Sequence, residues 1–154
     1  ELFDRVITPI LLYGCEVWCP NMTNLPSKLQ LRFYKIIVKL NKSTPTCMVY
    51  SELGQYPLEI QAKSRMLNFW FSLVNDTNQS KFSCIMYRFL HQLYQENKYK
   101  SPFLSYVNTT LNDIGLSGLW TQQPHCHISQ TWFKNKVIQS LKDQYIQQWY
   151  SEVD

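Results

Sequence analysis

The sequence lacks several features that mark whole classes of protein. No apolar run approaches the roughly 20 residues that a membrane-spanning helix needs, so we expect no contact with a membrane. No stretch near the start combines a basic head, an apolar middle and a small-residue cleavage site, which argues against a secretory signal. Only four residues are glycine, and there is no low-complexity tract. These absences favour a folded intracellular domain, in the nucleus or the cytoplasm.

Recognisable catalytic motifs are absent as well. The sequence has no Gly-x-Ser-x-Gly nucleophile elbow, no phosphate-binding P-loop and no acidic pair at metal-binding spacing. Its aspartates are scattered, and no two are adjacent. Cys126 stands between two histidines, but neighbours on an extended loop point apart, so we expect no Cys/His nucleophile there. The chain alone is therefore predicted not to be an enzyme.

Cysteine is too sparse to form a disulfide framework. Five cysteines are an odd number without framework spacing, which favours a reducing compartment. Cys15 and Cys19 lie four residues apart, but they could hold zinc only if segment 125–127 met them across the fold. We therefore predict no metal and no cofactor in this chain. Asn-x-Ser/Thr sequons would suit a secreted glycoprotein, yet they carry little weight without a signal peptide; they begin at Asn21, Asn41, Asn75, Asn78 and Asn108.

What the chain does contain is a folded, helical pattern. Apolar residues make up 45% of the sequence and aromatic residues 15%, which is typical of a domain with a core. Apolar residues recur at helical spacing, no long stretch alternates with period two, and Pro and Gly mark starts and stops. We predict an all-α bundle of about six helices, as one compact unit or two lobes. The helical segments are expected near residues 2–13, 27–40, 45–53, 57–74, 80–96, 101–115 and 129–150.

The segment 75–79 is the expected hinge between an N-terminal half, residues 1–75, and a C-terminal half, residues 80–154. Each half has a helix with an apolar face that we expect to point inward. In segment 27–40 this face consists of Leu29, Phe33, Ile36, Ile37 and Leu40. In segment 80–96 it consists of Phe82, Ile85, Met86, Phe89, Leu90, Leu93 and Tyr94.

Positive charge is concentrated in one quarter of the chain. The net charge is +4, while the stretch from Lys28 to Arg65 holds seven cationic and two acidic residues. Five of these cations are spaced by 4, 3, 4 and 3, so a continuous helix would place them in one row: Lys28, Arg32, Lys35, Lys39 and Lys42. Like charges at this spacing repel each other unless an anion lies nearby. A nucleic-acid backbone is such an anion, and a solvated basic face is the alternative.

Two further cations and several aromatic residues lie near this row. Lys63 and Arg65 are second-rank candidates for contact with phosphate. The aromatic residues could stack on bases, but aromatic side chains in helical bundles usually belong to the core. Tyr34 is the exception, because it lies off the apolar face, between Arg32 and Lys35; the others considered are Trp18, Tyr50 and Tyr56. Lys134, Lys136 and Lys142 are read as part of a mixed, solvated surface.

Three segments resemble one family. They are LLYGCEVW (11–18), KSTPTCMVYSELGQYPLEIQAKSRMLNFW (42–70) and IGLSGLW (114–120). They are similar to the region that follows the palm in reverse transcriptases of LINE-type, non-LTR retrotransposons. There, a helix with a Tyr-Gly-x-Glu-x-Trp pattern leads into a helical thumb and a C-terminal extension. The second segment is the most specific, and the resemblance covers nearly the whole chain.

This resemblance implies a fragment of an RNA-directed DNA polymerase, which primes on nicked genomic DNA. The palm, with its catalytic aspartates and bound Mg, would lie outside this chain, and the start at Glu1 suggests a piece of a longer polypeptide. The implied partners are the missing palm and the backbone of an RNA–DNA or DNA duplex, held by the basic row. The alternative from another class is a non-catalytic helical protein-interaction module, or an inactive transposon relic. Zinc knuckles near the C-terminus of some family members have a dense Cys spacing that this chain lacks.

Overall fold

The computed structural model describes residues 3–21, 25–76, 78, 80–123 and 128–153, and these residues form helices without a β-strand. The prediction of an all-α fold is confirmed. A π-helical turn, η1 (Phe3–Ile7), opens the chain, and a 3-10 turn, η2 (Cys19–Asn21), follows the second α-helix. The α-helices are α1 (Thr8–Leu11), α2 (Cys15–Trp18), α3 (Leu25–Ile37), α4 (Thr46–Glu52), α5 (Leu58–Asn75), α6 (Phe82–Gln95), α7 (Pro102–Asp113), α8 (Gly118–Thr121) and α9 (Gln130–Val153). No described helix is both long and apolar enough to cross a membrane.

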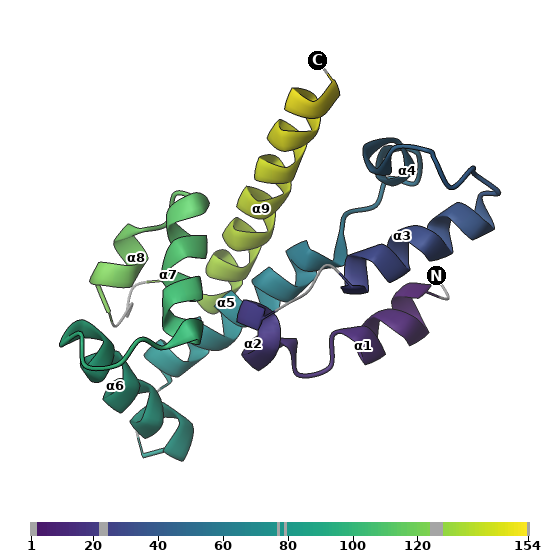
Figure 1. Ribbon diagram of the computed structural model, residues 1–154. Helices are drawn as coiled ribbons and strands as arrows, with labels where there is room; N and C mark the ends of the chain where they lie inside the picture. The colour runs from purple at the N-terminus through teal and green to yellow at the C-terminus, as the bar shows by residue number, and fades with distance from the viewer. Residues whose placement is uncertain (1–2, 22–24, 77, 79, 124–127, 154) are drawn as a thin grey trace.

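Helix α5 is the centre of the architecture. Figure 1 shows α6, α7 and α8 gathered near one end of α5, and α1, α3 and α4 near the other, while α9 crosses α5 and projects away from it. The crossing is held by Phe71 and Phe133, whose rings stack with centroids 4.1 Å apart. Trp70 and Val137 are fully buried beside them. Residues on both sides of segment 75–79 thus share one hydrophobic core.

The ends of several helices follow from local sequence signals. Gly54 and Gly115 adopt positive φ angles just after α4 and α7, a backbone conformation that favours glycine. Ser101 caps α7, because its hydroxyl accepts a hydrogen bond from the Leu104 amide. Ser129 caps α9 in the same way, since its hydroxyl accepts from the Trp132 amide at 3.2 Å. These stops and starts lie where the sequence predicts them.

Helix α3 is rotated relative to the prediction. Gln30 and Tyr34 are its buried residues, whereas Leu29, Ile36 and Ile37 are exposed. Gln30 is 1% exposed, yet its amide is fully engaged: it donates to the Tyr34 hydroxyl and the Tyr56 carbonyl and accepts from Tyr50 and from Leu58. These bonds join α3, α4 and the start of α5. The polar side chain of Gln30 can be buried because all its hydrogen bonds are satisfied. The prediction that Leu29, Ile36 and Ile37 point inward is therefore wrong.

Helix α6 also exposes part of the apolar face that was predicted to point inward. Its buried residues are Cys84 and Tyr87, and Tyr87 joins the core together with the partly buried Leu90 and Tyr94. The rest of the predicted face is open, with Phe82 77% exposed and Phe89 55% exposed. The neighbouring Ile85 and Met86 are also exposed. The helix has more apolar surface than the described chain covers, so it must leave one apolar row uncovered. The prediction that this whole stripe points inward is therefore wrong.

Candidate nucleic-acid interface

The predicted row of five cations does not lie on one continuous helix. Lys28 and Arg32 are one turn apart on α3 and are exposed. The helix ends at Ile37, three residues earlier than predicted, and Lys39 has a φ of 55°, which breaks the helical path. Lys39 and Lys42 therefore lie in the turn beyond α3, where both are exposed. Their position relative to Lys28 is set by this turn and not by a helical period.

Lys35 has a structural role in this turn. Its ammonium donates hydrogen bonds to the backbone carbonyls of Lys42, at 2.8 Å, and Thr44, at 2.7 Å. Two of its three donors are thereby used inside the protein. The bonds hold the segment after α3 against the basic side of the helix, so Lys42 lies close to Lys35 although it is not on α3. Lys35 thus positions the turn, and a phosphate would have to compete with these carbonyls.

The two second-rank cations, Lys63 and Arg65, contact different groups within the protein. Lys63 forms a salt bridge with Glu59, one turn earlier on α5, with a nitrogen–oxygen distance of 2.7 Å. This neighbouring carboxylate offsets its charge. Arg65 is exposed, and its guanidinium donates to the carbonyl of Leu12 at 3.4 Å. Neither residue continues the α3 row, and Arg65 lies instead beside a different feature, a groove between α5 and α9.

The aromatic residues near the basic region belong mainly to the core. Tyr34 is 7% exposed and Tyr50 is 2% exposed, and the two rings meet edge to face at 6.2 Å. The prediction that Tyr34 is the aromatic residue open to base stacking is therefore wrong, because α3 turns its side chain inward beside Gln30. Burial also raises the pKa of both hydroxyls. Trp18 and Tyr56 are half-buried, and the Trp18 indole donates to the Tyr13 carbonyl at 2.8 Å.

The cysteines near the start of the chain are buried thiols. Cys15 and Cys19 are at most 1% exposed, and neither forms a disulfide. Burial raises the pKa of Cys15, and it raises the pKa of Cys19 to about 12. Both thiols therefore stay protonated at neutral pH, which disfavours metal binding and nucleophilic attack. Among the described residues no cluster of His, Cys, Asp and Glu could hold a metal; segment 125–127 lies outside them.

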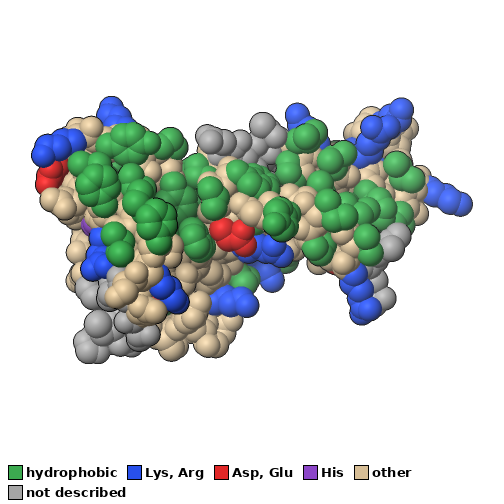
Figure 2. Space-filling view, turned by 90° about the horizontal axis from the view of Figure 1, so that it is seen from below, with side chains coloured by type: hydrophobic (Ala, Val, Ile, Leu, Met, Phe, Trp, Pro, Cys, Tyr) green, Lys and Arg blue, Asp and Glu red, His purple; other side chains and the backbone are tan. Residues whose placement is uncertain are grey.

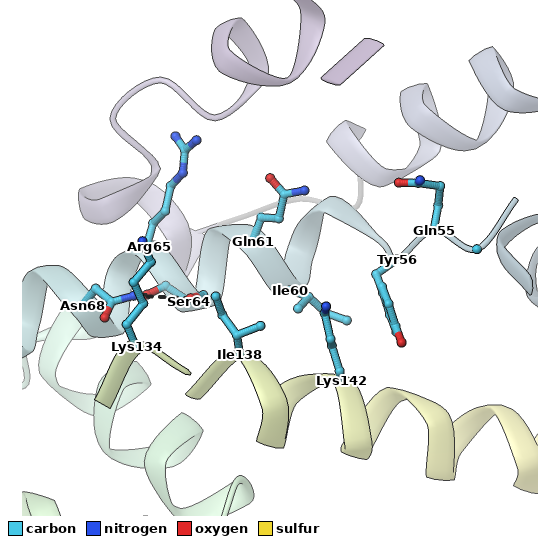
Figure 3. Close-up of a pocket in the computed structure, with 11 residues that line it drawn as sticks. Gln55, Tyr56, Ile60, Gln61, Ser64, Arg65, Asn68, Lys134, Ile138 and Lys142 are labelled. Atoms are coloured by element: carbon cyan, nitrogen blue, oxygen red, sulfur yellow. Dashed lines mark hydrogen bonds between the residues drawn. The ribbon is translucent and has the colours of Figure 1, made fainter. Parts of the chain in front are cut away.

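A cationic groove lies between α5 and α9 (Figure 3). Its central part has a volume of about 510 Å³ and lies between the start of α5 and the first half of α9. Figure 3 shows Lys134, Ile138 and Lys142 rising from α9 toward α5, while Gln61 and Arg65 extend from α5. The Lys142 ammonium lies 4.8 Å from the centre of the Tyr56 ring, a cation–π distance.

Sequence reasoning missed Lys134 and Lys142 as site residues. Together with Lys136, both were assigned to a mixed, solvated surface. The useful signal is the spacing of 4 and 4 through Ile138, which aligns Lys134 with Lys142 on one side of α9. That this side faces α5 could not be read from the sequence.

Searches with this chain against protein-family models, curated proteins and solved structures found no match.

Proposed function

We propose that the chain is the thumb and post-thumb region of a LINE-type reverse transcriptase and binds the backbone of a nucleic-acid duplex. The three resembling segments and the all-α architecture support this assignment. The segment 42–70 runs through α4 into α5, the helix on which the rest of the fold is built. In the parent polyprotein, the palm would supply the catalytic aspartates and Mg. This chain would hold the RNA–DNA duplex and contact the palm, without catalysis of its own.

The observation that carries the binding proposal is the group of exposed cations on and just after α3. Lys28, Arg32, Lys39 and Lys42 are all exposed, and within the described residues none forms a salt bridge. Lys35 holds the turn that presents two of them. We call these four residues the α3 cations. Unpaired lysine and arginine side chains can displace the counterions of a phosphate backbone without reading its sequence.

A salt titration tests this function. Binding of the chain to a short RNA–DNA hybrid duplex is measured by fluorescence anisotropy at several salt concentrations. If Lys28 and Arg32 each contact a phosphate, changing both to Gln should flatten the log–log salt slope by about 1.8, or about 0.9 per contact. The affinity should fall with it.

The matched control changes Lys100 and Lys136 to Gln, which removes the same charge from exposed positions elsewhere in the chain. A smaller effect of the control on slope and affinity supports local contact. Equal effects of both double variants would show that only net charge matters and would refute the α3 site. A folded wild-type chain that does not bind duplex at low salt would refute the binding proposal itself.

A specific observation also favours the alternative, a protein-interaction module. Figure 2 shows hydrophobic side chains spread over the face that includes α6 and the N-terminal helices. In the N-terminal segment Ile10 is 71% exposed and Val17 is 69% exposed, and α6 adds Phe82 and Phe89. Contiguous apolar surface of this kind is typical of contact with another protein surface. A palm domain would meet this requirement within the first proposal, and an unrelated partner would meet it within the second.

A further inference from the structure

The groove between α5 and α9 is longer than its central part. At one end it continues into a hollow of about 670 Å³ between Phe69 on α5 and the first turn of α9; Arg65, Asn68 and Lys134 line both parts. At the other end it continues into a hollow of about 300 Å³ between α4 and the last turns of α9, with Gln55 and Tyr56 shared. The groove thus follows α9 from about residue 130 to 150, roughly 30 Å at the helical rise. An elongated site of this length fits a chain-like ligand.

The groove is positively charged. Arg65, Lys134 and Lys142 line its middle, and among the described residues that line it only Glu16, at one end, is acidic. No salt bridge within the described part of the chain involves Lys134 or Lys142. Amide side chains, such as that of Gln61, supply neutral donors and acceptors between the cations. This pattern suits a ligand with repeated negative charges and polar groups between them.

The end of the groove near α4 is aromatic. Tyr56, Tyr145, Trp149 and Tyr150 line it, and Tyr150 is 59% exposed. The Trp149 indole nitrogen is covered and has no hydrogen-bond partner among the described residues. A buried donor without an acceptor is uncommon in folded proteins. What this end presents to a ligand is therefore the exposed ring of Tyr150.

We propose that this groove binds single-stranded nucleic acid: Lys134 and Lys142 contact its phosphates, and the aromatic end stacks a base. Cations along a groove combined with exposed aromatic rings are the usual arrangement for sequence-independent binding of single strands. A duplex fits less well, because its bases already stack on each other and cannot reach Tyr150. This site is separate from the α3 cations and does not depend on their function.

Anisotropy titrations with labelled oligo(U) and oligo(dT) of about 12 nucleotides test the proposal, a length within the usual range of single-strand sites. Changing Lys134 and Lys142 to Gln should flatten the log–log salt slope for either probe by about 1.4, or about 0.7 per contact. Changing Tyr150 to Ala should weaken binding roughly 5- to 150-fold, the range for loss of one stacked base. The Lys100 and Lys136 double variant is the matched control, because Lys136 lies on α9 but does not line the groove.

The same variants, titrated with the hybrid duplex, separate the two sites. The groove variant should retain duplex binding, and the variant of Lys28 and Arg32 should retain binding of single strands. Circular dichroism first establishes that each variant is folded. The groove proposal is overturned if wild-type chain does not bind single strands, or if the groove and control variants bind them with equal affinity and slope. If the variant of Lys28 and Arg32 loses duplex binding but still binds single strands, the groove proposal stands.

Discussion

The hydrogen-bonded position of Gln30 gives the strongest test of how this fold is held together. Gln30→Met keeps a side chain of similar length but removes both the amide oxygen and the amide nitrogen. Tyr50 can still donate to the Ser27 carbonyl, at 3.3 Å, so that hydroxyl keeps a partner. The amide of Leu58, a fully buried residue, the carbonyl of Tyr56 and the hydroxyl of Tyr34 lose the bonds that Gln30 makes to them.

The size of the effect follows from these three groups. Each buried polar group that loses its partner costs about 1–3 kcal/mol, so the free energy of unfolding should fall by about 3 kcal/mol. The total free energy of unfolding of a domain is only about 5–15 kcal/mol. At roughly 2–4 °C per kcal/mol for this chain length, the midpoint of thermal unfolding should fall by about 6–12 °C.

Urea and thermal unfolding, followed by circular dichroism, measure this change against the wild type. Gln61→Met, on the exposed side of α5, is the matched control and should change stability by no more than about 0.5 kcal/mol. A Gln30→Met variant that is as stable as the control would refute the structural role of Gln30. That result would mean that α3 does not turn Gln30 toward α4 and α5.

Two further predictions test buried and exposed positions elsewhere. Burial lowers the pKa of His91, whose Nε2 has no partner among the described residues, so the unfolded chain takes up the proton first. The stability that neutral His91 gives is complete above about pH 6.5 and is lost as the pH falls from there toward the lower folded-state pKa. Between pH 5 and 8, the free energy of unfolding of His91→Phe should therefore lack this dependence on pH. Changing the exposed Phe82 and Phe89 of α6 to Ser should alter the free energy of unfolding by only about 1 kcal/mol in total, whereas two core phenylalanines would cost about 3–5 kcal/mol each. A loss of the larger size in urea unfolding would show that α6 faces the core as the sequence pattern predicts.

The sequence predicted best those features that depend on a few neighbouring residues. Ser101 and Ser129 start helices, and Gly54 and Gly115 end them, because caps and positive φ angles are local requirements. The end of α3 was missed because nothing near Lys39 is Gly or Pro. Lys39 adopts a positive φ while Lys35 binds the carbonyls of the following turn, and that interaction is not visible in residue spacing. One early helix end was enough to divide the predicted row of cations.

The orientation of helices was harder to predict, because an amphipathic pattern does not say what covers the apolar side. On α3, Gln30 is polar by type but is buried with all its hydrogen bonds satisfied, while Ile36 is 67% exposed. The candidate groove was missed for a related reason. Lys134 and Lys142 belong to a site only because α9 crosses α5, and this crossing depends on the stacking of Phe71 on Phe133, 62 residues later in the chain.

The misplaced apolar faces bear on function as well as on prediction. A row of exposed Phe and Ile side chains on α6 and on the N-terminal helices exposes apolar area to water, and each side chain of that size favours burial by about 1.5–3 kcal/mol. The α3 cations and the groove lysines Lys134 and Lys142, by contrast, gain nothing from burial against an apolar surface. The chain therefore presents two kinds of surface with different needs, one for a protein contact and one for an anionic polymer. Our proposal accounts for both: a neighbouring palm would cover the apolar face and leave the cations open to nucleic acid. A relic without partners would need neither surface. Nucleic-acid binding that is lost in the charge variants but unaffected by Phe82→Ser and Phe89→Ser would separate the two surfaces experimentally.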